Sequence, residues 1–152
     1  MSNQAMHGSV LAIGVFDLFH IGHLRYLQYA RTQGKHLSVA ISPDVIVYDV
    51  KQKSPTIQQD QRMEIIRGLG WVDFVGLLPT TTNDTQAATQ WIEAWGIDHV
   101  VVGGEWSGSA RWNRLTPFLA KRGISVGFAP HTAGISTSRI VEAIQVQSSK
   151  TP

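Results

Sequence analysis

The stretch from residue 12 to residue 23, Ala-Ile-Gly-Val-Phe-Asp-Leu-Phe-His-Ile-Gly-His, limits the possible folds of this chain more than any other. An apolar run ends at Phe16, and His20 and His23 then stand three residues apart around Gly22. Apolar residues continue at helical spacing, so the pattern predicts a strand that turns into a helix. The free amides at the start of such a helix, and a glycine without a side chain, suit close approach of a phosphate. The stretch therefore predicts a phosphate-binding turn.

Size and composition indicate one ordinary domain. The chain has 152 residues, enough for a single core, and a net charge of +2 with no basic run argues against a nucleic-acid partner. No apolar stretch approaches the roughly 20 residues of a membrane span, and no signal-peptide pattern opens the chain. The absence of cysteine excludes disulfides and thiolate metal sites. We expect a cytoplasmic domain at 8–147 without a membrane partner, between flexible ends at 1–7 and 148–152.

Strand and helix patterns alternate along the chain. The expected strands cover 10–16, 36–41, 72–78, 99–102 and 125–128. The expected helices cover 21–33, 56 to about 69, about 86–95, 110–121 and 136–145. Short, nearly all-apolar strands between helices are typical of a parallel sheet that is covered on both faces. We therefore expect a single α/β domain, Rossmann-like and doubly wound, with a five-stranded parallel sheet and helices on both faces.

Several local features carry their own expectations. Gly34 is a candidate left-handed cap for the first helix, and Thr56 with Gln59 forms a candidate capping box. The segment 45–47 fits either a short helix or a strand, and 51–55 reads as a loop. Pro117 is expected to kink or split its helix.

The polar residues of interest follow the ends of the expected strands. They form four groups: 17–23, Lys51 with Lys53, 104–106 and 131–137. In parallel α/β sheets, ligands bind beyond the carboxyl ends of the strands, where the strand order reverses. The four groups are therefore expected at one rim of the sheet.

The first turn differs from two common phosphate motifs. No Gly-x-Gly-x-x-Gly follows the first strand, and no Gly-x-x-x-x-Gly-Lys-Ser/Thr occurs. Histidines instead occupy the turn, and their imidazoles donate hydrogen bonds and can carry charge near neutral pH. Such groups suit phosphoryl chemistry, which depends mostly on positioning and electrostatic stabilisation. Considered alone, the His-x-x-His pair also fits a metal half-site or a polar surface.

Two signatures in register resemble those of the cytidylyltransferase-like nucleotidyltransferases. Residues 14–23 resemble the family's HxGH signature, and 135–140, Ile-Ser-Thr-Ser-Arg-Ile, resemble its second signature. Three further pieces resemble bacterial glycerol-3-phosphate cytidylyltransferase: Lys51-Gln52-Lys53 with Arg62 and Val72-Asp73, then Gly104-Glu105-Trp106, then Pro130 to Thr137. The resemblance covers about residues 9 to 145.

The resemblance implies transfer of a nucleoside monophosphate to a phosphorylated acceptor, with release of pyrophosphate. The leading expectation is CMP transfer from CTP to glycerol 3-phosphate or a similar polyol phosphate, with Mg²⁺ as cofactor and a homodimer as the assembly. One alternative is adenylyl transfer from ATP to a sugar 1-phosphate of the heptose-phosphate type or to FMN. Another is a nucleotide-binding regulator without turnover. The acceptor needs no strong base, because a phosphomonoester has a second pKa of about 6.

The same resemblance assigns roles to individual residues. His20, His23 and Lys53 would be catalytic. The nucleotide would be bound by Gly14, Val15, Phe16, Asp17, Gly22, Gly104, Glu105, Trp106, His131, Thr132, Ser136 and Thr137. Lys51, Arg62 and Arg111 would bind the acceptor or phosphates, with orientation of neighbouring side chains as the alternative for Arg62, and Asp17 or Glu105 would help to place the metal. Ser136 also fits an ordinary helix N-cap.

Some residues depart from the cytidylyltransferase pattern. Val15 stands where glycerol-3-phosphate cytidylyltransferase has threonine. Valine there, with a Gly-Gly pair like Gly103-Gly104, resembles the heptose-phosphate adenylyltransferases. His131 replaces an arginine and exchanges a fixed charge for a titratable ring. The segment 107–114 resembles neither group. These positions bear on the identity of the substrates rather than on the type of reaction.

Overall fold

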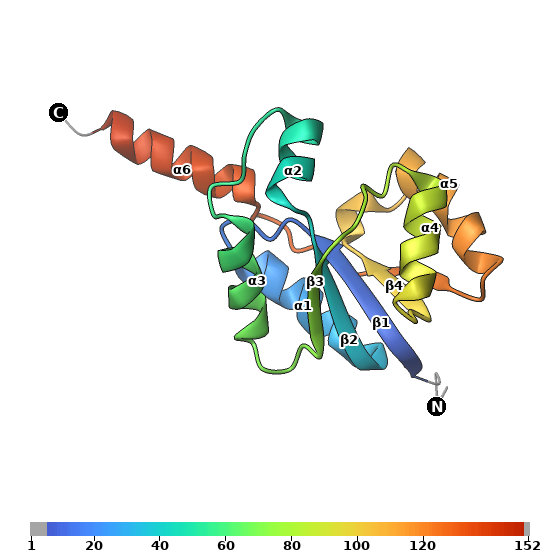
Figure 1. The fold of residues 1–152 in the computed structure, drawn as a ribbon. Helices are drawn as coiled ribbons and strands as arrows, with labels where there is room; N and C mark the ends of the chain where they lie inside the picture. Colours follow the sequence, from blue (N-terminus) through green and yellow to red (C-terminus); the bar gives the residue numbers. More distant parts are fainter. Residues whose placement is uncertain (1–5, 151–152) are drawn as a thin grey trace.

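Five parallel strands form one sheet in the computed structural model, which describes residues 6–150 (Figure 1). The strands are β1 (His7–Gly14), β2 (Gly34–Ile41), β3 (Phe74–Leu77), β4 (His99–Val102) and β5 (Ser125–Phe128). Their order is β3-β2-β1-β4-β5, so the direction of winding reverses between β1 and β4. The Rossmann-like parallel sheet expected from the sequence is confirmed.

Helices cover both faces of this sheet. They are α1 (Ile21–Thr32), α2 (Asp44–Lys51), α3 (Gln59–Arg67), α4 (Thr85–Ala94), α5 (Ala110–Ala120) and α6 (Thr137–Ser149), with a short 3₁₀ helix, η1 (Gly104–Trp106). Alternate residues of β1 point to opposite faces, as a strand requires: Val10 and Ala12 pack with α1 and α3, and Leu11 packs with α4 and α5. None of the described helices is long and apolar enough to cross a membrane.

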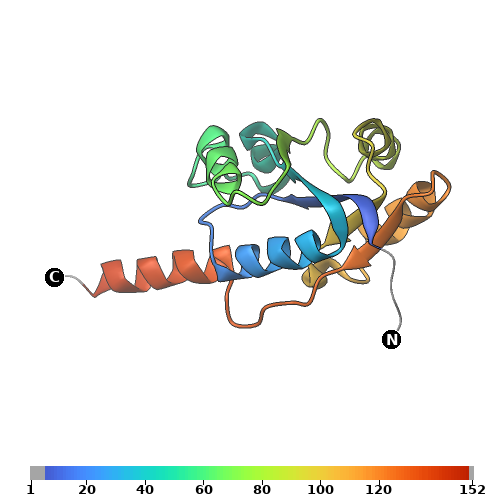
Figure 2. The same cartoon turned by 90° about the horizontal axis from the view of Figure 1, so that it is seen from below.

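α6 lies apart from these layers. It has no fully buried residue, and it extends away from the sheet in both views (Figures 1 and 2). Its first turn nevertheless lies beside the start of α1, and the two helices meet with their N-termini together (Figure 2). The folded region therefore places two helix N-termini at one end of the sheet.

The ends of several elements differ from the expected positions. β1 stops at Gly14, because Phe16 and Leu18 adopt left-handed backbone angles (φ 57° and 50°) that a strand cannot contain. At its other end β1 includes His7, whose ring stacks on His99 with 3.9 Å between centroids. α6 continues to Ser149 rather than ending near residue 145. The parts of the expected flexible ends at 1–5 and 151–152 lie outside the described residues.

Gly34 is not a left-handed cap. α1 ends at Thr32, its C-cap residue Gln33 has an ordinary right-handed conformation, and Gly34 is the first residue of β2. A Cβ atom at this position would clash with the side chain of Val10 and lie 3.0 Å from the carbonyl oxygen of His7. Close approach of β2 to β1, rather than backbone angle, therefore explains the glycine.

The structure also decides three other local expectations. α3 begins at Gln59 without a capping box, because the backbone N–H groups of Thr56 and Ile57 are taken by Asp17. The segment 45–47 is helical, one of its two expected alternatives, and α2 extends to Lys51, which was expected to lie in a loop. Pro117 does not split α5, whose buried residues on either side of it pack in the same core.

Arg62 is buried instead of facing a phosphate. Its side chain is fully enclosed, and its guanidinium donates to the carbonyl oxygens of Ile57 (2.9 Å), Val15 (2.6 Å) and Ser42 (3.0 Å) and to Oδ1 of Asp44 (2.6 Å). These groups belong to the segments that follow β1 and β2, to the start of α2 and to the segment before α3. The predicted role of Arg62 in binding acceptor or phosphate is therefore wrong, and its role is to join these segments.

Replacing Arg62 with Met should lower the free energy of unfolding by about 3–5 kcal/mol, because the Asp44 carboxylate and three carbonyl groups lose their partner. Urea unfolding followed by circular dichroism measures this change. Arg67→Met, on the exposed end of the same helix, is the matched control and should change stability by less than about 0.5 kcal/mol. Equal effects of the two substitutions would contradict the role given to Arg62.

Candidate active site

Two adjoining cavities lie at the carboxyl ends of β1 and β4, where the strand order reverses. Their volumes are about 610 Å³ and 350 Å³. Both are lined by His23, Tyr26, Gly103, Glu105 and Thr137, so these residues mark the junction of the cavities. This is the place where ligands bind in open α/β sheets.

Tyr26 holds the sheet open at this junction. The pairing of β1 with β4 ends at Ala12 and Val101. Beyond it, the Tyr26 hydroxyl donates to the carbonyl oxygen of Val101 (2.5 Å) and accepts from the N–H of Ile13 (3.0 Å). A side chain therefore replaces the next strand-to-strand contact, and burial raises the pKa of this hydroxyl so that it stays a donor. Tyr26 was not among the predicted site residues, although its place three residues after His23, on the core side of α1, is a usable signal.

The turn that carries His20 and His23 packs against the side chain of Phe16. The Phe16 side chain is 3% exposed, and its ring meets that of His23 edge to face with 5.4 Å between centroids. A Cβ atom at Gly14 would lie 2.9 Å from the Phe16 ring. A glycine at this position therefore leaves the space in which Phe16 sits beneath the site.

His20 and His23 present matching donors to the cavities. His20 caps α1, with its Nδ1 accepting from the N–H of Gly22 (3.1 Å), and His23 Nδ1 accepts from the N–H of His20 (3.3 Å). Because both Nδ1 atoms accept, the proton of each neutral ring is on Nε2. The rings stack with 3.7 Å between centroids. Each ring therefore carries its N–H donor on Nε2, because the backbone N–H groups occupy Nδ1.

Both rings are neutral in the ligand-free protein at pH 7. Burial lowers the pKa of His20. The pKa of His23 falls to about 4, chiefly through burial and then through the proximity of His20, while Asp17 opposes the shift. A bound phosphate would add negative charge and raise both pKa values again. The two histidine rings can therefore gain protons when an anionic ligand binds, while both stay neutral in the ligand-free protein.

Asp17 organises the loops around the turn and does not fit a metal ligand. Its Oδ2 accepts from the N–H of Thr56 (2.8 Å), and its Oδ1 accepts from those of Ile57 (2.9 Å) and Leu18 (3.1 Å). Its carbonyl oxygen accepts from Oγ1 of Thr137 (3.0 Å). The carboxylate is thus already engaged by three backbone amides. Within residues 6–150, no group of three or more His, Asp or Glu side chains could hold a metal by itself.

The start of α6 adds a second positive helix end. Ser136 is the N-cap, with Oγ accepting from the N–H of Arg139 (3.1 Å), and Thr137 lines both cavities. His131, Thr132 and Ser136 line the smaller cavity. The amides at the starts of α1 and α6 therefore converge on the junction, which favours an anion.

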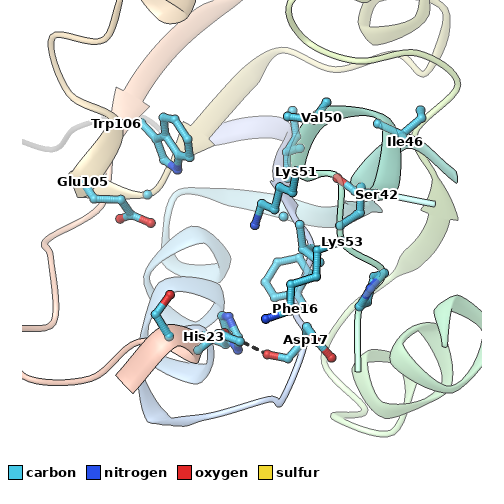
Figure 3. A pocket seen from close by; sticks show the side chains of 18 of the residues that line it. Phe16, Asp17, His23, Ser42, Ile46, Val50, Lys51, Lys53, Glu105 and Trp106 are labelled. Carbon is cyan, nitrogen blue, oxygen red and sulfur yellow. Dashed lines mark hydrogen bonds between the residues drawn. The ribbon is translucent and has the colours of Figure 1, made fainter. Parts of the chain in front are cut away.

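Basic and aromatic residues complete the larger cavity. Lys51 and Lys53 extend from one side, with Glu105 and Trp106 opposite them and His23 and Asp17 at the base (Figure 3). The guanidinium carbon of Arg111 lies 5.2 Å from the centre of the Trp106 ring. Arg111 also donates to the side chains of Asn83 and Thr82, and burial lowers its pKa.

The turn after β4 depends on a glycine that lets two backbone segments approach closely. A Cβ atom at Gly104 would clash with the carbonyl oxygen of Ala129 and lie 3.0 Å from the nitrogen of His131. Glu105, next in the chain, has its Oε2 at 3.7 Å from Nδ1 of His131. The glycine thus lets η1 pack against the segment that carries His131.

The structure brings together nearly all the site residues predicted from sequence. The larger cavity is lined by Gly14, Val15, Phe16, Asp17, His23, Lys51, Lys53, Glu105, Trp106, Arg111 and Thr137, and the smaller by His20, Gly22, Gly104, His131, Thr132 and Ser136. Arg62 is the exception among them.

Comparison with known protein families decides the classification. The family model described as "Cytidylyltransferase-like" matches residues 11–143. The chain belongs to this family. The resemblance inferred from the two signatures is confirmed, and the domain is that of a nucleotidyltransferase family.

Among curated relatives of this cytidylyltransferase-like domain, several are named bifunctional protein HldE. The protein from Citrifermentans bemidjiense is 36% identical over 136 residues, which cover 89% of this chain and 26% of the relative. That from Halorhodospira halophila is 36% identical over 137 residues, covering 90% of this chain and 27% of the relative. The chain thus spans about a quarter of the length of these relatives.

Solved structures show the same fold. A lipopolysaccharide core biosynthesis protein from Thermoplasma volcanium aligns with a TM-score of 0.64 and 25% identity, covering 82% of this chain and 96% of the other. A bifunctional NMN adenylyltransferase/ADP ribose pyrophosphatase from Francisella tularensis aligns with a TM-score of 0.63 and 16% identity, covering 91% of this chain and 41% of the other. The second similarity concerns the fold alone.

The lowered pKa values predict a pH-dependent stability. His23 and His99 have pKa values of about 4 in the folded protein, each lowered first by burial, against about 6.5 in an unfolded chain. Between these values the unfolded state binds more protons, so stability should be greatest above about pH 6.5 and fall as the pH is lowered toward 4. Urea unfolding at several pH values measures this dependence.

A pair of variants tests whether His23 causes the dependence of stability on pH. His23→Asn should flatten the fall in stability between pH 6.5 and 4, because the substituted side chain does not titrate. His36→Asn, at an exposed position on β2, is the control and should leave the slope close to that of the unmodified protein. Stability that does not change over this range would contradict the neutral, buried state of His23.

Proposed function

We propose that this chain transfers an adenylyl group from ATP to a sugar 1-phosphate of the heptose-phosphate type and releases pyrophosphate. The observation that carries the proposal is the meeting of two cavities at the His20–His23 pair and at the N-termini of α1 and α6. The smaller cavity would take the nucleoside and the larger the acceptor, with the reacting phosphates between them.

The choice of ATP and a sugar phosphate replaces the leading expectation of CTP and glycerol 3-phosphate. The matches to HldE proteins support it better, as do Val15 and the Gly103-Gly104 pair, which resemble the heptose-phosphate adenylyltransferases. The Thermoplasma relative is named for the synthesis of a saccharide-containing product, which fits a sugar acceptor. The Lys51-Gln52-Lys53 segment, which resembles the cytidylyltransferase, is compatible with either acceptor because it recognises phosphate.

The proposed reaction is a direct displacement. An oxygen of the acceptor phosphate attacks the α-phosphorus of ATP, a new P–O bond forms, and the bond to the bridging oxygen of pyrophosphate breaks. The attacking group is already an anion near neutral pH, so no residue needs to remove a proton. Lys51 and Lys53 offset the repulsion between the two anions. The Nε2–H groups of His20 and His23 and the helix N-termini stabilise charge on the transferring phosphate.

We propose that Mg²⁺ accompanies the triphosphate, and one of the two candidate carboxylates suits it. Asp17 is an unsuitable ligand because three backbone amides already occupy its carboxylate. Glu105 is suitable, because its side chain is 55% exposed and lines both cavities. Mg²⁺ prefers phosphate oxygens, waters and one or two carboxylates, so a single protein ligand suffices. When bound, the ion would supply positive charge to the phosphate oxygens.

The decisive experiment measures pyrophosphate release with four nucleoside triphosphates against heptose 1-phosphate, mannose 1-phosphate, glycerol 3-phosphate and FMN, with Mg²⁺ present. ATP with heptose 1-phosphate should give the highest kcat/KM. Preference for CTP with glycerol 3-phosphate would restore the cytidylyltransferase interpretation. Triphosphate binding without release in any pair would instead favour a regulator that lacks turnover.

His23→Ala should reduce kcat by about 10²-fold or more, the scale expected for loss of a preorganised donor to the developing charge. His20→Ala should have a similar effect, with some additional loss of stability because His20 also caps α1. His36→Ala, an exposed histidine on β2, is the control and should retain normal kcat. Near-normal turnover in both site variants would refute the role given to the histidine pair.

A further inference from the structure

The wall that α6 adds to the larger cavity has side chains that phosphate binding does not explain. Five residues of α6 line this cavity: Thr137, Ser138, Val141, Glu142 and Gln145. Their spacing puts them along one side of the helix. Thr137 and Ser138 lie in the first turn, beside the junction where the phosphates are proposed to react. Glu142 and Gln145 lie about one and two turns further along the helix.

Glu142 and Gln145 have unused hydrogen-bonding capacity. Both side chains are exposed to solvent at the edge of the cavity, and within residues 6–150 neither has a protein partner in a hydrogen bond or ion pair. An ionised carboxylate accepts through two oxygens, and a carboxamide both accepts and donates. Together they offer the combination that recognises hydroxyl groups, each of which is both donor and acceptor.

The charge of Glu142 limits what this wall can bind. A carboxylate repels a phosphate dianion, while it forms charge-assisted hydrogen bonds with hydroxyl groups. The phosphate-binding cations Lys51 and Lys53 come instead from the end of α2 and the residues after it. The larger cavity is thus divided into a cationic part for phosphate and a part along α6 for hydroxyl groups.

The size of the cavity agrees with this division. Its volume of about 610 Å³ lies within the range of sites for drug-sized ligands, about 300–1,000 Å³. Glycerol 3-phosphate has only two hydroxyl groups on a three-carbon chain and would leave much of this space empty. A sugar phosphate carries more hydroxyl groups and reaches further from its phosphate.

We infer that Glu142 and Gln145 bind the hydroxyl groups of the acceptor and set a preference for a polyhydroxylated sugar phosphate over glycerol phosphate. This inference rests on the proposed function for the presence of a phosphorylated acceptor. It goes further because it assigns acceptor specificity to side chains of α6. Triphosphate binding and the transfer itself are assigned to the junction of the cavities. The two side chains are specificity-determining residues that contact the acceptor.

The experiment compares acceptor kinetics of the double variant Glu142→Ala/Gln145→Ala with those of the unmodified protein, at saturating ATP. The KM for heptose 1-phosphate should rise roughly 10-fold or more, the scale for losing hydrogen bonds that include a charged partner. The KM for ATP should change less than about twofold, and the kcat/KM for glycerol 3-phosphate should be unchanged within the same limit. Glu142→Gln, which keeps the acceptor oxygen without the charge, should fall between the two proteins.

Matched controls separate the possible failures. Glu64→Ala, at an exposed position on α3, should leave all these values unchanged, and thermal unfolding should show that every variant is folded. An unchanged KM for heptose 1-phosphate in the double variant would overturn this inference while leaving the proposed function intact. An equal loss with both acceptors would also overturn it. Absence of turnover and of calorimetric binding with every sugar phosphate in the unmodified protein would overturn the proposed function itself, and this inference with it.

Discussion

The engagement of the Asp17 carboxylate by backbone amides is the interaction on which the site depends. One side chain draws together the turn after β1 and the segment before α3, while its carbonyl oxygen receives the hydroxyl of Thr137 from α6. Arg62 then fixes the same region from inside, through the carbonyl oxygens of Val15 and Ser42. A carboxylate that resembles a metal ligand in the sequence thus joins the turn that carries the histidines to the segment before α3.

The parts of the fold that could be predicted from the sequence are those set by local patterns. β4 and β5 lie where their apolar runs place them, because a short buried strand leaves a continuous apolar signal. Ser136 caps α6, as its residue type favours. The placement of polar groups at one rim also followed, since parallel strands bring their carboxyl ends together. Residue type and topology were sufficient for these features.

The remaining features depend on contacts between distant residues. Arg62 looks like a phosphate ligand in the sequence, and only its enclosure by residues from positions 15 to 57 shows that it cannot reach one. Gly34 looks like a cap, and only the proximity of Val10 reveals a packing constraint. Tyr26 carries no motif, because its importance comes from where the β1–β4 pairing stops. Residue spacing does not reveal contacts between residues that are distant in the sequence, so these three roles could not be predicted from it.

The meeting of the α1 and α6 N-termini has a consequence for the course of the reaction. The partial positive charges of two helix N-termini that lie side by side repel each other modestly in the ligand-free protein. Any polyphosphate that lies between them removes this repulsion. In the proposed reaction, pyrophosphate would carry the same phosphate groups that the triphosphate presents to these helix ends, so the ends that bind the donor would also bind the leaving group. For the proposed reaction, a site built from two opposed helix dipoles would therefore bind its pyrophosphate product as an inhibitor.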